Sequence, residues 1–152
     1  MRRWMKSRVS EPDFRTLMEV ARAARKGAYA RYSHFAVGAA LLWEDGEIVS
    51  GANVENASYG LSMCAERTAV FHAVTSGARE FSAIAVAGPD GVRTLPCGAC
   101  RQVLAEFAPA IRVIFDDGGT AGEISLTELL PEPFGPAQLA EAKTVAAGRS
   151  RV

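Results

Sequence analysis

The sequence lacks the features that would mark a nucleic-acid-binding or membrane protein. Its 152 residues contain 17 basic and 17 acidic side chains, so there is no excess of positive charge with which to bind nucleic acid or an anionic membrane. No run of 18 apolar residues is present, which argues against a membrane-spanning helix. The N-terminus is basic but no apolar segment follows it, so we expect no secretory signal and a cytoplasmic location.

Cysteine and histidine are also scarce. The chain has three cysteines and two histidines. An odd number of cysteines without a secretory signal does not predict a disulfide framework, and the thiols are better interpreted as free or as metal ligands. A chain of this length buries roughly two-thirds of its unfolded surface, so it needs no disulfides to fold.

The pattern of apolar residues predicts one α/β domain over residues 11–147, with flexible ends at 1–10 and 148–152. Helices are predicted over residues 12–30, 64–75, 97–107 and 137–147. Strands are predicted over 36–43, 48–54, 81–88, 111–117 and 123–130, the last running into a short helix. The apolar strands indicate a three-layer α/β/α sandwich with a mixed, five-stranded sheet. The first two strands should be antiparallel and the later ones parallel, because a helix precedes each of these.

All three cysteines lie where a helix is predicted to begin. Cys64 precedes one apolar-periodic segment, and Cys97 and Cys100 open another, three residues apart. The N-terminus of a helix favours the thiolate, the form that binds zinc. Three interpretations are open: small buried side chains, a redox dithiol of Cys97 and Cys100, or a metal site that includes Cys64.

The number of available ligands separates two kinds of zinc site. A catalytic zinc uses three protein ligands and leaves one position open, whereas a structural zinc usually has four. His72 is eight residues beyond Cys64, about two turns along the same helix, and is too far away to join. His34 is not excluded by its spacing, so a closed structural site remains an alternative to the three-cysteine catalytic site.

Glu66 follows Cys64 by two residues. Residues two apart in a helix point in different directions, so Glu66 can reach the metal only if the helix begins within a residue or two of Cys64. A carboxylate at that position could act as general base and proton carrier. The alternative is an ordinary solvated glutamate on a helix surface.

The order Cys-Ala-Glu and, thirty residues later, Pro-Cys-x-x-Cys resembles the signature of zinc-dependent deaminases in a three-cysteine form. More widely, the sequence resembles the small homotetrameric cytidine deaminases. The stretches that carry the resemblance run from Ala28 to Gly135 and are AYARYSHFAVGAALL, GANVENASYG, MCAERTAVFHAV, LPCGACRQVLAEF and LLPEPFG.

The resemblance implies a role for each matching residue. Cys64, Cys97 and Cys100 would hold one Zn²⁺ per chain, and Glu66 would be the general acid and base. Arg67 would donate hydrogen bonds to the zinc thiolates. The implied contacts with substrate are made by Phe35, Asn53, Glu55, Ala57, Tyr59, Ala65 and Phe134. Asn53 and Glu55 would bind the ribose 3′-hydroxyl, while Ala57, Tyr59 and Phe134 would reach a neighbouring subunit's site.

The implied activity is hydrolytic deamination of cytidine, and of 2′-deoxycytidine, within pyrimidine salvage. The implied assembly is a homotetramer with shared active sites and a small nucleoside substrate, without a nucleic-acid or membrane partner. Two alternatives stay open: a deaminase of the same fold acting on another aminonucleoside, a nucleotide or a base in nucleic acid, and a non-enzymatic domain with a structural zinc.

Overall fold

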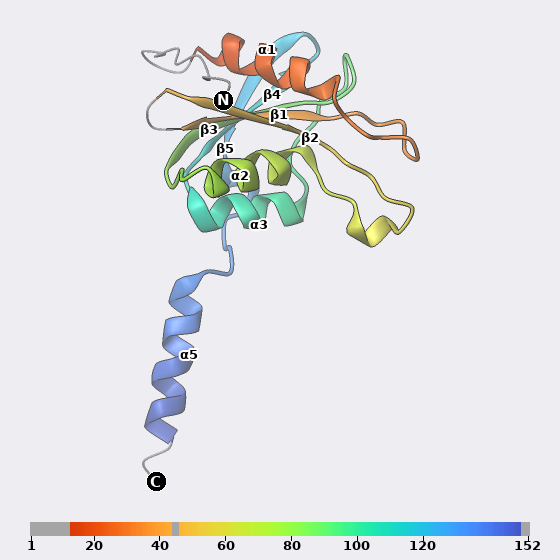
Figure 1. The fold of residues 1–152 in the computed structure, drawn as a ribbon. Helices are drawn as coiled ribbons and strands as arrows, with labels where there is room; N and C mark the ends of the chain where they lie inside the picture. Colours follow the sequence, from red (N-terminus) through yellow and green to blue (C-terminus); the bar gives the residue numbers. More distant parts are fainter. Residues whose placement is uncertain (1–12, 44–45, 150–152) are drawn as a thin grey trace.

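A mixed five-stranded sheet forms the centre of the molecule (Figure 1). The computed structural model describes residues 13–43 and 46–149, and its strands follow the order β2-β1-β3-β4-β5. The elements are α1 (Phe14–Arg25), β1 (Gly38–Trp43), β2 (Ile48–Ala52), the 3₁₀ helix η1 (Tyr59–Leu61), α2 (Ala65–Thr75), β3 (Phe81–Ala87), α3 (Gly98–Phe107), β4 (Arg112–Asp117), β5 (Thr120–Ser125), α4 (Leu126–Leu129) and α5 (Pro136–Arg149).

Helices cover both faces of the sheet, which confirms the predicted three-layer α/β/α sandwich (Figure 1). Alternate residues of β1 point to opposite layers, as the two-residue period of a strand requires. Ala40 and Leu42 belong to a core with α1, whereas Ala39 and Leu41 belong to a second core with α2 and α3. Because helices cover both faces of the sheet, β1 and β3 are buried almost throughout. Strands buried in this way have continuously apolar sequences.

The strand directions agree with the prediction except at β5. β1 and β2 are antiparallel, and β4 is parallel to β3, which it follows through α3. The expectation that the later strands are all parallel is wrong for β5, which is antiparallel to β4. Gly118 and Gly119 adopt φ values of 64° and 96°, and such a two-glycine turn returns the chain as a hairpin. As a result β5 begins at Thr120, three residues before the predicted strand.

Two helices differ in length from the prediction. α1 ends at Arg25 and not near residue 30, because the chain turns through Gly27 and the amide of Tyr29 then donates to the carbonyl of Asn53. α5 continues to Arg149, two residues into the segment predicted to be flexible. The remaining predicted flexible residues, 1–10 and 150–152, lie outside the described residues.

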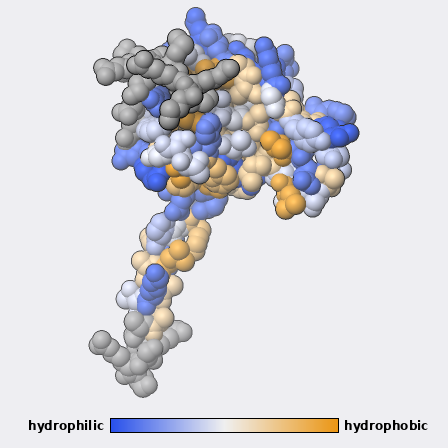
Figure 2. Space-filling model, viewed as in Figure 1, coloured by the Kyte–Doolittle hydropathy of each residue, from blue (hydrophilic) through white to orange (hydrophobic). Residues whose placement is uncertain are grey.

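The last helix projects from the body of the molecule (Figure 1). Its side chains are exposed over residues 136–146, including Leu139 and Val145. Figure 2 shows apolar and polar residues side by side on this arm. Within the described residues, no helix is both long and apolar enough to cross a membrane.

Glycines allow α1 and α2 to lie directly on the sheet. A Cβ atom at Gly38 would lie 2.0 Å from the carbonyl oxygen of Ala21 in α1. A Cβ atom at Gly51 would lie 2.5 Å from the amide nitrogen of Ala69 in α2. Since such approaches are possible only without a side chain, these two glycines fix the distance of each helix from the sheet.

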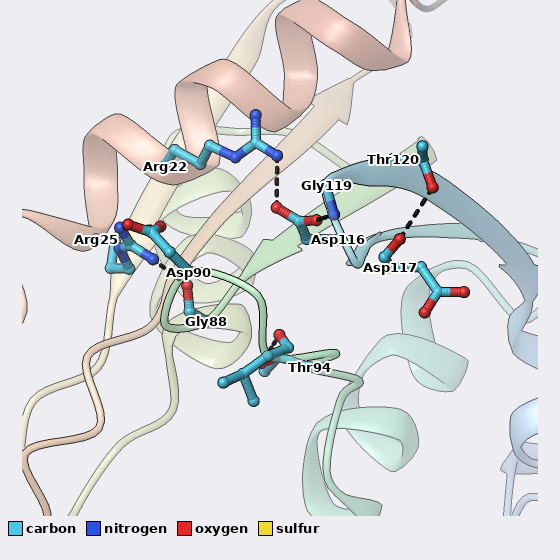
Figure 3. Close-up of polar contacts among 10 residues, drawn as sticks. Arg22, Arg25, Gly88, Asp90, Thr94, Asp116, Asp117, Gly119 and Thr120 are labelled. Atoms are coloured by element: carbon cyan, nitrogen blue, oxygen red, sulfur yellow. Dashed lines mark hydrogen bonds and ion pairs between the residues drawn. The ribbon is translucent and has the colours of Figure 1, made fainter.

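Hydrogen bonds from two arginines of α1 hold this helix to the rest of the domain (Figure 3). Arg22 donates to Asp116 of β4 at 2.5 Å. Arg25 donates to the carbonyl of Gly88 and, at 2.7 Å, to the carboxylate of Asp90. The first bond holds α1 to β4, and the bonds of Arg25 hold it to the loop that leads from β3 towards Cys97.

Candidate metal centre

The three cysteine sulfurs come together at the N-termini of two neighbouring helices. Cys64 is the N-cap of α2, Cys97 is the N-cap of α3, and Cys100 lies in the first turn of α3. The Sγ atoms of Cys64 and Cys97 are 3.9 Å apart, and those of Cys97 and Cys100 are 3.5 Å apart. All three thiols are free. The expectation that α2 begins within two residues of Cys64 is confirmed.

This cysteine cluster (Cys64, Cys97 and Cys100) has the dimensions of a zinc site. All of its sulfurs lie within 4.8 Å of one another. Three sulfurs bound at about 2.3 Å to one tetrahedral ion lie about 3.8 Å apart, close to the two distances above. Within the described residues the cluster includes neither His34 nor His72. The donor set is therefore that of a three-ligand site, and the fourth ligand required by the closed-site alternative is absent from it.

The surroundings of Cys64 stabilise its thiolate. The neighbouring Cys100 thiol and the Arg67 guanidinium lower the pKa of Cys64 to about 5. Arg67 Nη2 lies 3.4 Å from the Cys64 sulfur. The pKa of Cys100 is raised because its proton is shared with the Cys64 thiolate and because it is buried. A divalent cation would replace the shared protons, which is the normal coupling of metal binding to deprotonation.

Arg67 has a further donor directed into the protein. Its Nε atom is buried and has no hydrogen-bond partner among the described residues. A buried donor needs an acceptor. Deprotonation of the cysteine cluster on metal binding would turn its sulfurs into stronger acceptors for this N–H group. The position of Arg67 therefore agrees with the predicted interaction with the sulfurs.

Glu66 is a buried carboxyl group next to the cysteine cluster. Its side chain belongs to the first turn of α2, and the residue is 4% exposed. Burial, and secondarily the charge of Cys64, raise the pKa of Glu66 to about 7. A carboxyl group of this kind can both accept and release a proton near neutral pH. It is not the solvated surface glutamate of the alternative interpretation.

The segment after β2 connects the loop of residues 29–37 to the start of α2, next to the cysteine cluster. The amide of Val54 donates to the carbonyl of Met63 and the amide of Met63 donates back, each at 2.9 Å. On its other side the amide of Glu55 donates to the carbonyl of Tyr29 at 2.8 Å. Because Met63 directly precedes Cys64, this ladder places Asn53 and Glu55 beside the start of α2.

Asn53 and Glu55 also hold the loop of residues 29–37. The Asn53 side chain accepts from the amide of Val37 and donates to the carbonyl of Phe35, both at 2.8 Å. Glu55 accepts from the amide of Tyr32 at 2.8 Å and from the hydroxyl of Ser33. The hydrogen bond from Ser33 and that from Tyr32 lower the pKa of Glu55. Both side chains keep a further lone pair or N–H group with which to bind a ligand.

The other predicted substrate residues fall into two groups. Ala65 is fully buried directly after Cys64, and Phe35 is 39% exposed on the loop that Asn53 holds. Ala57, Tyr59 and Phe134 are exposed, with 75% of Tyr59 and 60% of Phe134 accessible. A single chain thus gathers Glu66 and Arg67 at the cysteine cluster and leaves four predicted substrate contacts exposed, namely Phe35, Ala57, Tyr59 and Phe134.

Two contacts of the candidate site residues were not predicted from the sequence. Ser33 supports Glu55, and no local pattern indicates this. Arg101 donates to the carbonyl of Pro96, immediately before Cys97. A signal for this second contact was available, since Arg101 follows Cys97 by four residues and therefore lies on the same face of α3.

Enzymes that combine cysteine-ligated zinc with a neighbouring, non-ligating glutamate are the zinc-dependent deaminases, and this chain falls in that class. Residues 12–116 match the family model described as the cytidine and deoxycytidylate deaminase zinc-binding region. The chain belongs to this family, and its cysteine cluster is the zinc site.

Individual relatives agree with this assignment. The chain is 51% identical over 124 residues to a cytidine deaminase of Halalkalibacterium halodurans, a match covering 80% of this chain and 94% of the relative. The crystal structure of cytidine deaminase from Burkholderia pseudomallei has 50% identity and a TM-score of 0.75, over 79% of this chain and 98% of that one. A blasticidin-S deaminase of Bacillus cereus is 32% identical over 81% of this chain and 92% of its own length.

Proposed function

We propose that the chain is a hydrolase that deaminates cytidine and 2′-deoxycytidine, yielding uridine or deoxyuridine and ammonia, with one zinc ion per chain. The observation that carries the proposal is the buried carboxyl of Glu66 beside the cysteine cluster. The relatives described above support the choice of a pyrimidine nucleoside as substrate.

Glu66 is the proton carrier in this reaction. Cys64, Cys97 and Cys100 would hold the zinc ion, which when bound supplies the Lewis acidity that makes water a nucleophile near neutral pH. Glu66 takes a proton from the attacking water and delivers it to N3 of cytosine, which makes C4 more electrophilic. The hydroxide left by this transfer adds to C4. Glu66 then takes the proton of the added hydroxyl and delivers it to the amino group, so that the C4–N bond breaks, ammonia leaves and the C4 carbonyl of the uracil base forms. A carboxyl with a pKa of about 7 suits both directions of transfer.

Arg67 and the helix ends adjust the charge of the centre. A dication with three thiolates carries a net charge of −1, which weakens its acidity. The guanidinium of Arg67, 3.4 Å from the sulfur of Cys64, withdraws part of that negative charge. The N-termini of α2 and α3 act in the same sense.

The substrate is held through its sugar and its base. Asn53 and Glu55 bind the ribose 3′-hydroxyl through the lone pairs and N–H groups that the loop leaves available. A carboxylate facing the sugar suits a neutral nucleoside and repels the phosphate of a nucleotide. Phe35 packs against the nucleoside, and the backbone of Ala65 contacts the pyrimidine.

The active form is a homotetramer in which neighbouring chains complete each site. The exposure of Ala57, Tyr59 and Phe134 supports this, because aromatic side chains on a surface are typical of contacts between chains. Phe134 would stack on the base bound by a neighbour. Residues 11–147 would form the single functional domain, and the enzyme would work in the cytoplasm in pyrimidine salvage.

A comparison of deamination rates on different substrates tests the proposal. Ammonia release should be fastest with cytidine and deoxycytidine, and much slower with cytidine monophosphate or a single-stranded oligodeoxynucleotide. The likeness to a blasticidin-S deaminase makes blasticidin S the necessary second candidate substrate. Preference for blasticidin S, or for either phosphorylated substrate, would contradict the proposed substrate class.

A further inference from the structure

Two adjacent side chains of α3 connect the cysteine cluster to the segment that ends in Phe134. Arg101 donates through Nε to the carbonyl of Pro96 and through Nη1 to the carbonyl of Leu129, each at 2.8 Å. Gln102 donates to the carbonyl of Phe134 at 2.7 Å. The bonds to Leu129 and Phe134 span 28 and 32 residues of sequence, so they join parts of the chain that are distant in sequence.

The bond from Arg101 to Pro96 acts on a zinc ligand. The carbonyl of Pro96 and the amide nitrogen of Cys97 belong to one planar peptide unit, so fixing the first orients the second. Pro96 is buried and Cys97 is exposed, and Cys97 has no side-chain cap bond as the N-cap of α3. Arg101 therefore supplies a restraint on the Cys97 backbone that the helix start itself does not.

The second bond of Arg101 links the same side chain to Leu129, in the C-terminal part of the chain. The Leu129 carbonyl belongs to the last turn of α4, where carbonyls lack partners within the helix. A guanidinium holds two acceptors in a rigid plane, so the peptide before Cys97 and the end of α4 are kept in fixed relation.

The segment of residues 130–133 between the two bonded carbonyls, called the strap below, is short and stiff. Leu129 and Phe134 are separated by Leu130, Pro131, Glu132 and Pro133, and each proline fixes one backbone dihedral. Beyond it, the amide of Gly135 is capped by Gln138, and α5 projects away from the body (Figure 1). Among the described residues, the bond from Gln102 is the last hydrogen bond from α3 to the segment that precedes α5.

We propose that Arg101 and Gln102 are positioning residues that couple the zinc site to Phe134. Arg101 sets the backbone of Cys97 and the start of the strap, and Gln102 sets the backbone of Phe134. The inference about Phe134 rests on the proposed function, in which its ring contacts the nucleoside bound by a neighbouring chain. The inference about Cys97 depends only on the zinc site.

Zinc affinity tests the first half. The zinc-loaded variant Arg101→Lys keeps the charge but cannot bridge the two carbonyls, and it should bind zinc about 10-fold or more weakly in competition with a chromophoric chelator. Arg79→Lys is the matched control, because Arg79 also bridges two carbonyls, those of Val74 and Ala78, at the other end of α2. Its zinc affinity should stay within about 2-fold of the wild type. An unchanged affinity in Arg101→Lys, or an equal loss in both variants, would overturn the inference.

Steady-state kinetics with cytidine test the second half. Gln102→Glu removes the N–H donor at nearly constant shape and should raise KM about 5-fold with kcat within about 2-fold. Gln138→Glu keeps the acceptor for the Gly135 amide and should change neither. A normal KM in Gln102→Glu, or an equal rise in Gln138→Glu, would refute the role of Gln102.

A double-mutant cycle tests the coupling itself. If Arg101 acts on KM through Phe134, Arg101→Lys should raise KM in the wild-type background but not in Phe134→Ala, while its zinc defect persists in both. Additive effects on KM would contradict the coupling. Should the wild type fail to deaminate cytidine, the proposed function falls, whereas the zinc titrations still decide the role of Arg101.

Discussion

Gly51→Ala should separate α2 from the sheet and weaken the zinc site at the same time. The added Cβ would lie 2.5 Å from the amide nitrogen of Ala69 and 2.7 Å from the carbonyl oxygen of Ala65. Relief to ordinary contact requires a shift of about 0.9 Å, the difference between 2.5 Å and 3.4 Å. Zinc–ligand distances tolerate only about 0.2 Å, and Ala65 is bonded to Cys64, so the displacement should reach the metal.

The size of the effect follows from overpacking. Insertion of a methyl group into a packed contact costs about 1–3 kcal/mol, which for a chain of this length lowers Tm by roughly 2–12 °C. Calorimetry of zinc-loaded protein measures the Tm, and titration with a chelator measures the zinc affinity. Gly27→Ala is the control, because its Cβ would meet nothing closer than the Ala24 carbonyl at 3.4 Å. A Gly51→Ala variant with the Tm and zinc affinity of Gly27→Ala would refute this account of the packing.

Three further outcomes are expected. Arg67→Gln loses the guanidinium 3.4 Å from Cys64 and should bind zinc about 10- to 100-fold more weakly in the same chelator titration. Removal of zinc by dialysis against a chelator should lower Tm reversibly, since a ligand at 100 times its Kd stabilises by about 2.7 kcal/mol; a Tm indifferent to zinc would contradict this. Asp116→Asn should destabilise the protein at neutral pH: the bond from Arg22 lowers the pKa of Asp116, so its stabilisation is present above the unfolded-state pKa and is lost as the pH falls through the folded-state pKa. Urea unfolding at several pH values should show the wild-type advantage disappearing in acid, and an advantage that grows in acid would be inconsistent with the ion pair.

The layers of the fold could be predicted because the apolar pattern reflects burial directly. Strands β1 and β3 are buried on both faces, and the matching apolar runs in the sequence located them to within two residues. The direction of β5 was missed because it depends on two positive φ values at Gly118 and Gly119, which a glycine pair permits but does not require. The early end of α1 was missed because it depends on pairing between Tyr29 and Asn53, a contact between distant segments.

The metal ligands could be predicted because chemistry and local structure coincide. Cys64 and Cys97 both lie at helix starts, and the spacing of Cys97 and Cys100 brings their thiols to one side of α3. The bonds from Arg101 to Leu129 and from Gln102 to Phe134 could not be inferred in this way, because their partners are 28 and 32 residues away. Backbone carbonyls leave no trace in the sequence, since every residue has one.

Glu66→Gln provides the most direct test of the central claim that Glu66 carries protons at a three-cysteine zinc site. Zinc content and the rate of cytidine deamination should be measured on the same preparations of wild type and variant. We expect about one zinc per chain in both proteins and a rate in the variant about 10²- to 10⁴-fold lower, the range for loss of a general acid and base. A variant that retains zinc and deaminates cytidine at close to the wild-type rate would show that Glu66 does not carry the protons.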